Sequence, residues 1–292
     1  MCEKAVGAVS GEIVGDTGKL ALLEDFVVKL RKDVFTVDEM KRFLRRENPF
    51  ATPVPMDFRE QTVAKVERIL LKRFGRKITV DTLPEILTEE NLRKAAKFNF
   101  QPVFSLGDVL LALDKPKNWV AIPGKFFQWE RNGKIASGSA IWPRGWYLAD
   151  FTVGVDYDDG RQIFQNDRLS SLIEGLRKTG RVGKYDKTPM GSRFAIVPDS
   201  EWLLVFTELA NELNFFTAKQ VSLESFAAFN VIGNIYDKNR GKFNMWEWFA
   251  DSFEDSYRLS GGSRGYGGLA YVDIDWDGCR DDIAGRPLVS FQ

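Results

Sequence analysis

Histidine is absent from the 292 residues of this chain, and cysteine occurs only as Cys2 and Cys279. Without histidine the chain cannot build a Ser–His or Cys–His nucleophilic pair, or an HExxH metal site. Two cysteines at opposite ends of the chain form no CxxC pair, so neither a disulfide framework nor a cysteine zinc site is expected. Acid–base catalysis remains open, but no carboxylate pair stands out among the 41 acidic residues.

Net charge and long apolar runs are also lacking. The 41 basic and 41 acidic side chains cancel, whereas nucleic-acid binders usually carry a basic excess. No segment approaches the roughly 18 consecutive apolar residues of a membrane-spanning helix. The first residues lack the apolar core of a signal peptide. We therefore expect a soluble chain with no nucleic-acid partner and no membrane insertion, at a location that the sequence does not specify.

The first hundred residues have helical periodicity. Apolar side chains recur every three to four positions over residues 20–30 and 36–47. A third amphipathic helix is expected over residues 63–74, closed by Gly75, and a fourth over residues 89–98 after a capping Thr88. This part of the chain is therefore predicted to be mainly helical.

The pattern changes near residue 115. Between there and residue 160, short aromatic or β-branched runs alternate with Gly, Pro and Asn turns, which predicts strands and hairpins. Asn132-Gly133 and Asp159-Gly160 are dipeptides typical of hairpin turns. The boundary between two regions is accordingly placed at residues 110–116.

Two further helices and a closing strand are expected beyond residue 160. The helices are predicted over residues 167–178 and 198–214, and the strand in the final RPLVSF segment. The inward face of the second helix is expected to hold Trp202, Leu203, Phe206, Leu209 and Leu213.

Three local patterns near the carboxyl end suggest chemistry, and each has a plainer interpretation. The segment SGGSRGYGG at 260–268 is rich in glycine, but it lacks the phosphate-loop lysine and hydroxyl, so tight turns are favoured. Asp273 to Gly278 copies the first half of a calcium-binding EF-hand loop, yet position twelve is Ala284 and an acidic solvated loop is favoured. Trp246 and Trp248 are expected in the core.

The order of motifs in residues 220–292 carries a family resemblance. N-x-W-E-W is followed by R-L-x-G-G and then by R-P-L-V-x-F. This order resembles the C-type lectin fold of formylglycine-generating-enzyme-like domains. It is more similar to the variable proteins of diversity-generating retroelements, of the archaeal-virus type and of small uncultivated prokaryotes. One departure is that the usual Gly-Phe-Arg is replaced by Ala284-Gly285-Arg286.

The resemblance implies an α+β chain in two parts. Residues 1–114 are expected to form a mainly helical accessory domain, which no motif of the family covers. Residues 115–292 are expected to form a C-type-lectin-like domain with short antiparallel strands, two helices and a loop-rich tail. Within it, the variable region is placed at about residues 255–285.

Retroelement mutagenesis leaves a mark on composition. It acts on adenines, and random change at the first two bases of an asparagine codon cannot yield Lys, Glu, Gln, Met or Trp. From Met1 to Glu254 the first four of these types number 49, and from Asp255 to Phe291 there are none. Residues 135–161 also lack all four, so the signal is partial. Trp276 is a tryptophan, the fifth type that mutagenised asparagine codons cannot yield, so it is expected to be an invariant scaffold residue.

The resemblance also divides the tail into two roles. A rigid framework of Gly, Trp and apolar residues would hold exposed side chains that change freely. The framework is assigned to Trp246, Trp248, Gly261, Gly262, Gly267, Gly268, Leu269, Val272, Trp276, Pro287 and Phe291. The variable ligand contacts are assigned to Ser260, Ser263, Arg264, Tyr266, Tyr271, Asp273, Asp275, Asp277, Gly278, Cys279, Arg280 and Asp281, with Tyr257 and Ile274 as weaker candidates.

These residues resemble a paratope, in which aromatic anchors combine with adaptable polar groups. The expected function is therefore binding and display, not catalysis, without a cofactor or a metal. The expected partner is a protein or a glycan on another cell or virion. Two alternatives stay open: an oxidoreductase of the formylglycine-generating type, for which the chain lacks a cysteine pair, and a calcium-dependent lectin using Asp273 to Asp277.

Overall fold

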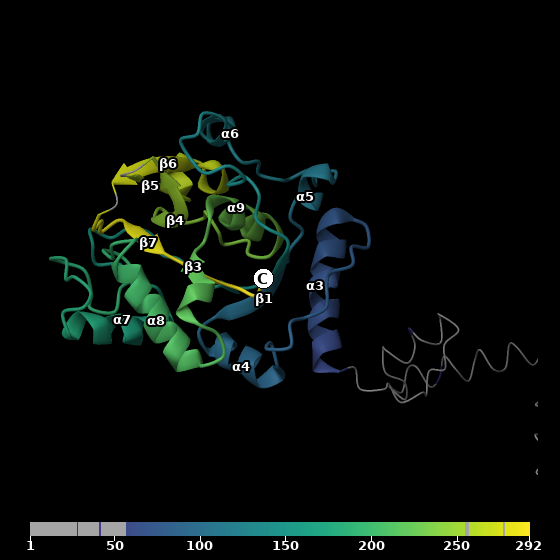
Figure 1. Cartoon of the computed structure of the whole chain (residues 1–292), viewed down its shortest axis with the longest axis horizontal. Helices are drawn as coiled ribbons and strands as arrows, with labels where there is room; N and C mark the ends of the chain where they lie inside the picture. The colour runs from purple at the N-terminus through teal and green to yellow at the C-terminus, as the bar shows by residue number, and fades with distance from the viewer. Residues whose placement is uncertain (1–27, 29–40, 42–56, 255–256, 277) are drawn as a thin grey trace, which may run out of the picture. The chain divides into compact units, whose positions relative to one another are not determined.

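The computed structural model describes residues 57–254, 257–276 and 278–292, with Val28 and Lys41 as isolated positions. Within these residues the chain forms seven α-helices and eight strands in two sheets, which confirms the α+β class (Figure 1). The helices expected over residues 20–30 and 36–47 lie outside the described residues.

The helices follow one another with the strands interspersed. Their bounds are α3 (Phe58–Phe74), α4 (Glu89–Lys97), α5 (Val109–Ala112), α6 (Gly124–Arg131), α7 (Leu169–Lys178), α8 (Glu201–Leu213) and α9 (Phe226–Ile235). The strands are β1 (Phe100–Ser105), β2 (Gly145–Asp150), β3 (Val221–Leu223), β4 (Trp246–Phe253), β5 (Tyr257–Gly261), β6 (Val272–Trp276), β7 (Ile283–Gly285) and β8 (Pro287–Ser290).

The first sheet joins residues from both ends of the described chain. Its order is β1-β2-β8-β3, with every neighbouring pair antiparallel. Because β1 precedes residue 115 and is linked through β2 to the C-terminal β8, the predicted boundary near residue 115 is wrong. The compact unit that contains both sheets begins at Asp57.

The second sheet has the order β6-β5-β4-β7. Strands β4, β5 and β6 are antiparallel to their neighbours, whereas β7 runs parallel to β4. Between β7 and β8 only Arg286 intervenes, so the chain passes from the second sheet to the first at this residue. The predicted C-terminal strand is confirmed as β8, and it is central in the first sheet.

Helix ends follow the expected capping chemistry. Gly75 ends α3 at φ 69°, where its N–H donates to the Leu71 carbonyl at 2.8 Å. Thr88 caps α4, and its side chain accepts a hydrogen bond from the Asn91 N–H at 3.2 Å.

The two helices predicted beyond residue 160 are present as α7 and α8, side by side in Figure 1. Four of the five predicted inward side chains of α8 are buried. Leu203 is instead 56% exposed, so its inward assignment is wrong.

The prediction of strands and hairpins over 115–160 holds only for β2. Residues 124–131 form α6, because Phe126 packs on Phe226 and Trp129 on Phe253, which matches the three-residue spacing of one helical face. Asn132-Gly133 ends this helix, with the Asn132 N–H donating to the Gln128 carbonyl at 3.0 Å. Asp159-Gly160 is a turn with positive φ at both residues, outside any strand pair.

Helix α9 was not predicted, and it carries much of the core. Ser225 caps it, and most of its residues are buried. Phe226 and Phe229 each stack on Phe249 of β4, with ring centroids 5.2 Å apart. A helix that is apolar on nearly all sides lacks the alternation of apolar and polar residues from which amphipathic helices are predicted. The sequence of α9 therefore contains no periodic signal for a helix.

Candidate functional site

A glycine-rich loop connects β5 and β6 and contains two 3-10 turns, η2 (Arg264–Tyr266) and η3 (Gly268–Ala270). Gly268 has φ 59°, and a Cβ there would lie 2.5 Å from the Gly241 carbonyl oxygen. The loop therefore approaches another backbone segment too closely for any side chain at this position. The turn interpretation of SGGSRGYGG agrees with this geometry.

Three aromatic rings meet beside this loop. Trp246, at the start of β4, lies 5.1 Å from Tyr266 and 5.2 Å from Tyr271 between ring centroids, and the two tyrosines are also 5.2 Å apart. Tyr266 is 61% exposed. The Lys125 Nζ lies 5.1 Å from the Tyr271 ring centroid, a cation–π contact from α6. The trio forms an aromatic surface supported from below by β4.

Charged side chains extend this surface along β6 and the segment after it. The Tyr271 hydroxyl donates to Asp273 Oδ2 at 2.8 Å. The Arg280 Nη1 donates to Asp275 Oδ1 at 2.8 Å, and the Arg280 Nε lies 3.3 Å from Asp282 Oδ1. These pairs are partly exposed, with Arg280 at 45% and Asp275 at 20% side-chain exposure. Such pairs orient one another while leaving room for a ligand.

A depression open to solvent, of about 1030 Å³, lies beside the aromatic trio. Its lining brings together Asn244, Trp246, Tyr266 and Arg280 with Tyr157 from a distant part of the chain. The Tyr157 hydroxyl donates to Asp281 Oδ2 at 3.3 Å across this depression. We define the candidate face by Tyr157, Trp246, Tyr266, Tyr271, Asp273, Asp275, Arg280, Asp281 and Asp282.

The electrostatics of the candidate face reflect crowded carboxylates. Partial burial, then the hydrogen bond to Asp273, raises the pKa of Tyr271 to about 12. Burial, then the negative charge of Asp281, raises the pKa of Tyr157. Burial also raises the pKa of Asp275, and the Arg280 guanidinium opposes that rise. At neutral pH both tyrosines therefore keep their hydroxyl protons and act as hydrogen-bond donors.

Behind the face, buried ion pairs join the two sheets. Arg286 Nε donates to Glu247 Oε2 at 2.8 Å, and Arg240 Nη2 donates to Glu224 Oε1 at 2.7 Å. Arg193 donates from Nε to Asp167 Oδ2 at 2.6 Å, and it also pairs with Asp150. We call these seven residues, together with Asp237 beside Arg240, the buried ionic cluster. Glu247 follows Trp246 directly, so the cluster anchors the strand that carries the aromatic trio.

Most of the residues predicted as ligand contacts are accessible. Arg264, Tyr266 and Arg280 are exposed, and the rest of the accessible set is half-buried: Tyr271, Asp273, Asp275, Gly278, Cys279 and Asp281. Asp277 lies outside the described residues. Of the weaker candidates, Tyr257 is 39% exposed, while Ile274 packs against the apolar cluster under α6.

Two predicted contacts are buried. Ser260 is fully buried, because β5 lies between β4 and β6, and its assignment as a ligand contact is wrong. Ser263 is only 3% exposed, although it lies in the lining of the depression.

The framework assignment needs one correction and one addition. Trp276 was expected in the scaffold, yet it is 64% exposed and stacks on Tyr257, 5.7 Å away across the β5–β6 pair. Trp246 belongs both to the framework and to the candidate face, because it is half-buried under the tyrosines. Trp248 and Val272 are buried as predicted.

Sequence reasoning missed Tyr157, Asn244 and Asp282 as parts of the face or of its depression. Asn244 Oδ1 accepts the Gly265 N–H at 3.0 Å, which holds the glycine loop against the segment before β4. Tyr157 lies between Asp156 and Asp158 in the sequence, and nothing local indicates that it meets Asp281.

The half EF-hand of Asp273 to Gly278 forms part of strand β6 and its exit. Asp273 Oδ2 accepts the Tyr271 hydroxyl, and Asp275 Oδ1 accepts the Arg280 guanidinium. Among the residues that the structure describes, no group of three or more potential ligand side chains is arranged to hold a metal ion.

Comparisons with family models, with curated proteins and with solved structures find no match to this chain. Within the described part of the chain, no helix is both long and apolar enough to span a bilayer.

Proposed function

We propose that this chain is a binding protein whose candidate face is diversified by a retroelement to recognise varied ligands, on a domain of the C-type lectin type. The main support is that Tyr266, Tyr271, Asp275 and Arg280, separated along the sequence, lie on one accessible face. A mobile or buried arrangement of these four side chains would give the proposal no physical basis.

The division between rigid support and accessible side chains adds to this support. Trp248 and Val272 are buried, and Gly268 has no space for a side chain. Substitutions at exposed positions on such a support usually change stability little. The absence of Lys, Glu, Gln and Met from Asp255 to Phe291 fits diversification at asparagine codons.

The proposed ligand is a protein or a glycan on another cell or virion. Tyr266 and Tyr271 offer flat rings that lose little conformational freedom on binding, and Asp281 and Arg280 offer polar contacts beside them. Both ligand classes are bound by surfaces of this kind, because aromatic rings stack on apolar groups and carboxylates accept hydrogen bonds from hydroxyl and amide donors.

Sequencing the genomic surroundings tests the proposal. We expect a reverse-transcriptase gene and a near-copy of the 3′ end of this gene that differs from it only at adenines. The differing codons should include those of Arg264, Tyr266, Tyr271 and Arg280. The codons of the buried or space-limited residues, such as Gly268, serve as internal controls and should be identical. A near-copy that differs at all four bases, or the absence of any near-copy, would contradict the proposal.

A further inference from the structure

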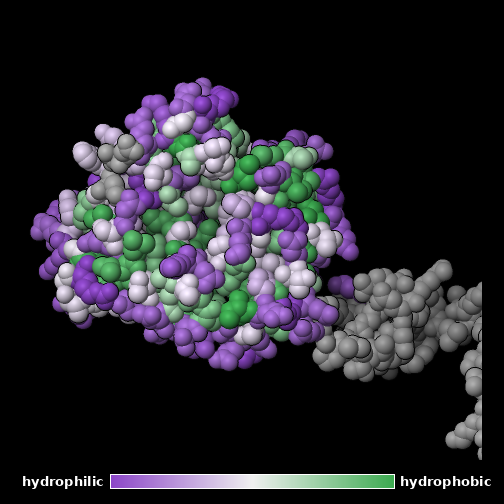
Figure 2. Space-filling model, viewed as in Figure 1, coloured by the Kyte–Doolittle hydropathy of each residue, from purple (hydrophilic) through white to green (hydrophobic). Residues whose placement is uncertain are grey.

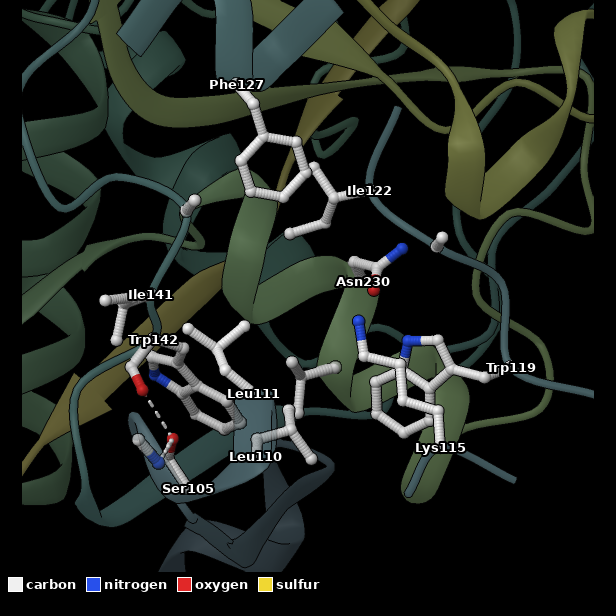
Figure 3. Close-up of a pocket in the computed structure, with 14 residues that line it drawn as sticks. Ser105, Leu110, Leu111, Lys115, Trp119, Ile122, Phe127, Ile141, Trp142 and Asn230 are labelled. Atoms are coloured by element: carbon white, nitrogen blue, oxygen red, sulfur yellow. Dashed lines mark hydrogen bonds between the residues drawn. The ribbon is translucent and has the colours of Figure 1, made fainter. Parts of the chain in front are cut away.

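A second hollow lies apart from the candidate face and shares no lining residue with it. It has a cavity volume of about 90 Å³ and lies between the β1–α5 connection, α6 and α9 (Figure 3). Ligand pockets for small molecules typically have mainly apolar walls with a few polar groups. The residues here fit that description.

The walls of this hollow are apolar and come from separate segments. Ile122 and Phe127 lie on one side, with Leu110 and Leu111 opposite, and Trp142 adjoins them (Figure 3). Leu111, one of these wall residues, is 54% exposed, so the apolar lining continues to the protein surface. Figure 2 shows hydrophobic residues gathered on the visible surface near the position of α5.

Buried polar contacts hold these walls in place. Asn234 donates from Nδ2 to the Val120 carbonyl at 2.9 Å and accepts the Val120 N–H at 2.8 Å. Asn230 donates to the same carbonyl at 3.0 Å. On the other side, the Ser105 hydroxyl donates to the Trp142 carbonyl at 2.7 Å. The hollow is therefore preformed, which lowers the entropic cost of binding.

Lys115 is the one charged residue in this lining, and Figure 3 shows its amino group directed inward beside Asn230. Asp108 and Asp114 are near Lys115 in sequence, but the lysine ion pairs found among the described residues do not include Lys115. A cation at the edge of an apolar hollow is complementary to an anion attached to an apolar body.

We propose that this hollow binds a carboxylate with an aromatic or branched apolar body, which packs on Phe127 and Trp142 while its carboxylate pairs with Lys115. Two sources share that chemistry: a free monocarboxylic acid, and the C-terminal residue of a peptide. The proposal does not depend on retroelement diversification, so either can fail alone.

Titration of the full chain with matched probes tests this proposal. The probes are 3-phenylpropanoate and its uncharged amide, and N-acetyl-Gly-Phe and its C-terminal amide. Binding is measured by calorimetry and by tryptophan fluorescence, since Trp119 and Trp142 line the hollow. We expect saturable binding of at least one acid, with its amide about tenfold weaker, equivalent to about 1.4 kcal/mol. Preference between the two acids identifies the source.

Two variants complete the test. Lys115→Met keeps the length of an exposed side chain and should weaken binding of the acid about tenfold without affecting the amide. Lys117→Met, which removes a neighbouring exposed lysine that does not line the hollow, should leave binding unchanged. The proposal is overturned if neither acid binds saturably, if acid and amide bind equally, or if both variants weaken binding alike.

Discussion

The candidate face and the buried ionic cluster use the same residue types, aspartate and arginine, in opposite environments. On the face, the Arg280–Asp275 pair is partly exposed, at 45% and 20% of the side chains. In the cluster, both side chains of the Arg193–Asp150 pair are fully buried. An exposed pair contributes little to stability, whereas a buried charge depends on its partners. The chain therefore combines replaceable charges on its surface with indispensable ones inside.

The largest effect that this comparison predicts comes from removing a buried arginine. Arg193→Met should lower the free energy of unfolding by about 3–5 kcal/mol, because Asp150 and Asp167 would remain buried without their partner. The matched substitution Arg280→Met should change it by less than about 1 kcal/mol. Urea unfolding of both variants measures the difference. Equal losses of unfolding free energy in the two variants would mean that burial does not make the arginine of the cluster more important for stability than the arginine of the face.

The buried ionic cluster should also make stability depend on pH. Burial raises the pKa of Glu224 from 4.5 to about 8 in the folded state, and the Arg240 guanidinium only partly opposes this. The folded protein therefore binds this proton more tightly than the unfolded chain, so stability falls as pH rises from about 4.5 to about 8. Burial likewise raises the pKa of Asp251 to about 6, which adds a decline of the same sign at lower pH.

The window from pH 6 to pH 8 isolates Glu224 from Asp251. We expect the free energy of unfolding to decrease across it, and Glu224→Gln to flatten that decrease, because glutamine has no proton to lose. Denaturant unfolding at pH 6, 7 and 8 measures both slopes. Identical slopes for the two proteins would show that another group causes the dependence.

The smallest expected effect on stability comes from replacing Trp276. This variant tests whether Trp276 belongs to the rigid support or to the exposed surface. Trp276→Ala removes an exposed ring that stacks on Tyr257, so the free energy of unfolding should fall by less than about 1 kcal/mol. Thermal or urea unfolding checks this value. A decrease of 3 kcal/mol or more in the free energy of unfolding would support the scaffold role. That role was predicted because tryptophan cannot arise from a mutagenised asparagine codon.

Local sequence patterns predicted the elements whose signals are local. Thr88 and Gly75 act through neighbouring backbone groups, so the limits of α4 and the C-terminal end of α3 could be read within one residue, whereas α3 begins five residues before its predicted start. The final strand was also predicted correctly, whereas the tail before it contains the four strands of the second sheet and is less loop-rich than expected. Tyr266 lies against Tyr271 and Arg280 pairs with Asp275, whereas the role of these four residues as ligand contacts stays a prediction.

Errors arose where a residue's environment depends on distant segments. Ser260 is polar and lies between variable candidates, yet the neighbours of β5 bury it. The segment around Phe126 contains turn-like residues, yet Phe226 and Phe253 stabilise it as a helix. The boundary at residue 115 was wrong because strand pairing between β1 and β2 acts across it.

The sequence by itself determined the absence of histidine chemistry, the α+β class, the helix caps and the segment that supplies most, but not all, of the candidate face. Only the tertiary structure decided which aspartates are exposed and which arginines are buried, that β8 joins β2, and that Lys115 faces an apolar hollow. The physical reason is the distance along the chain over which each interaction acts. Capping and turns depend on backbone groups a few residues apart, whereas burial and charge pairing depend on atoms brought together from anywhere in the chain.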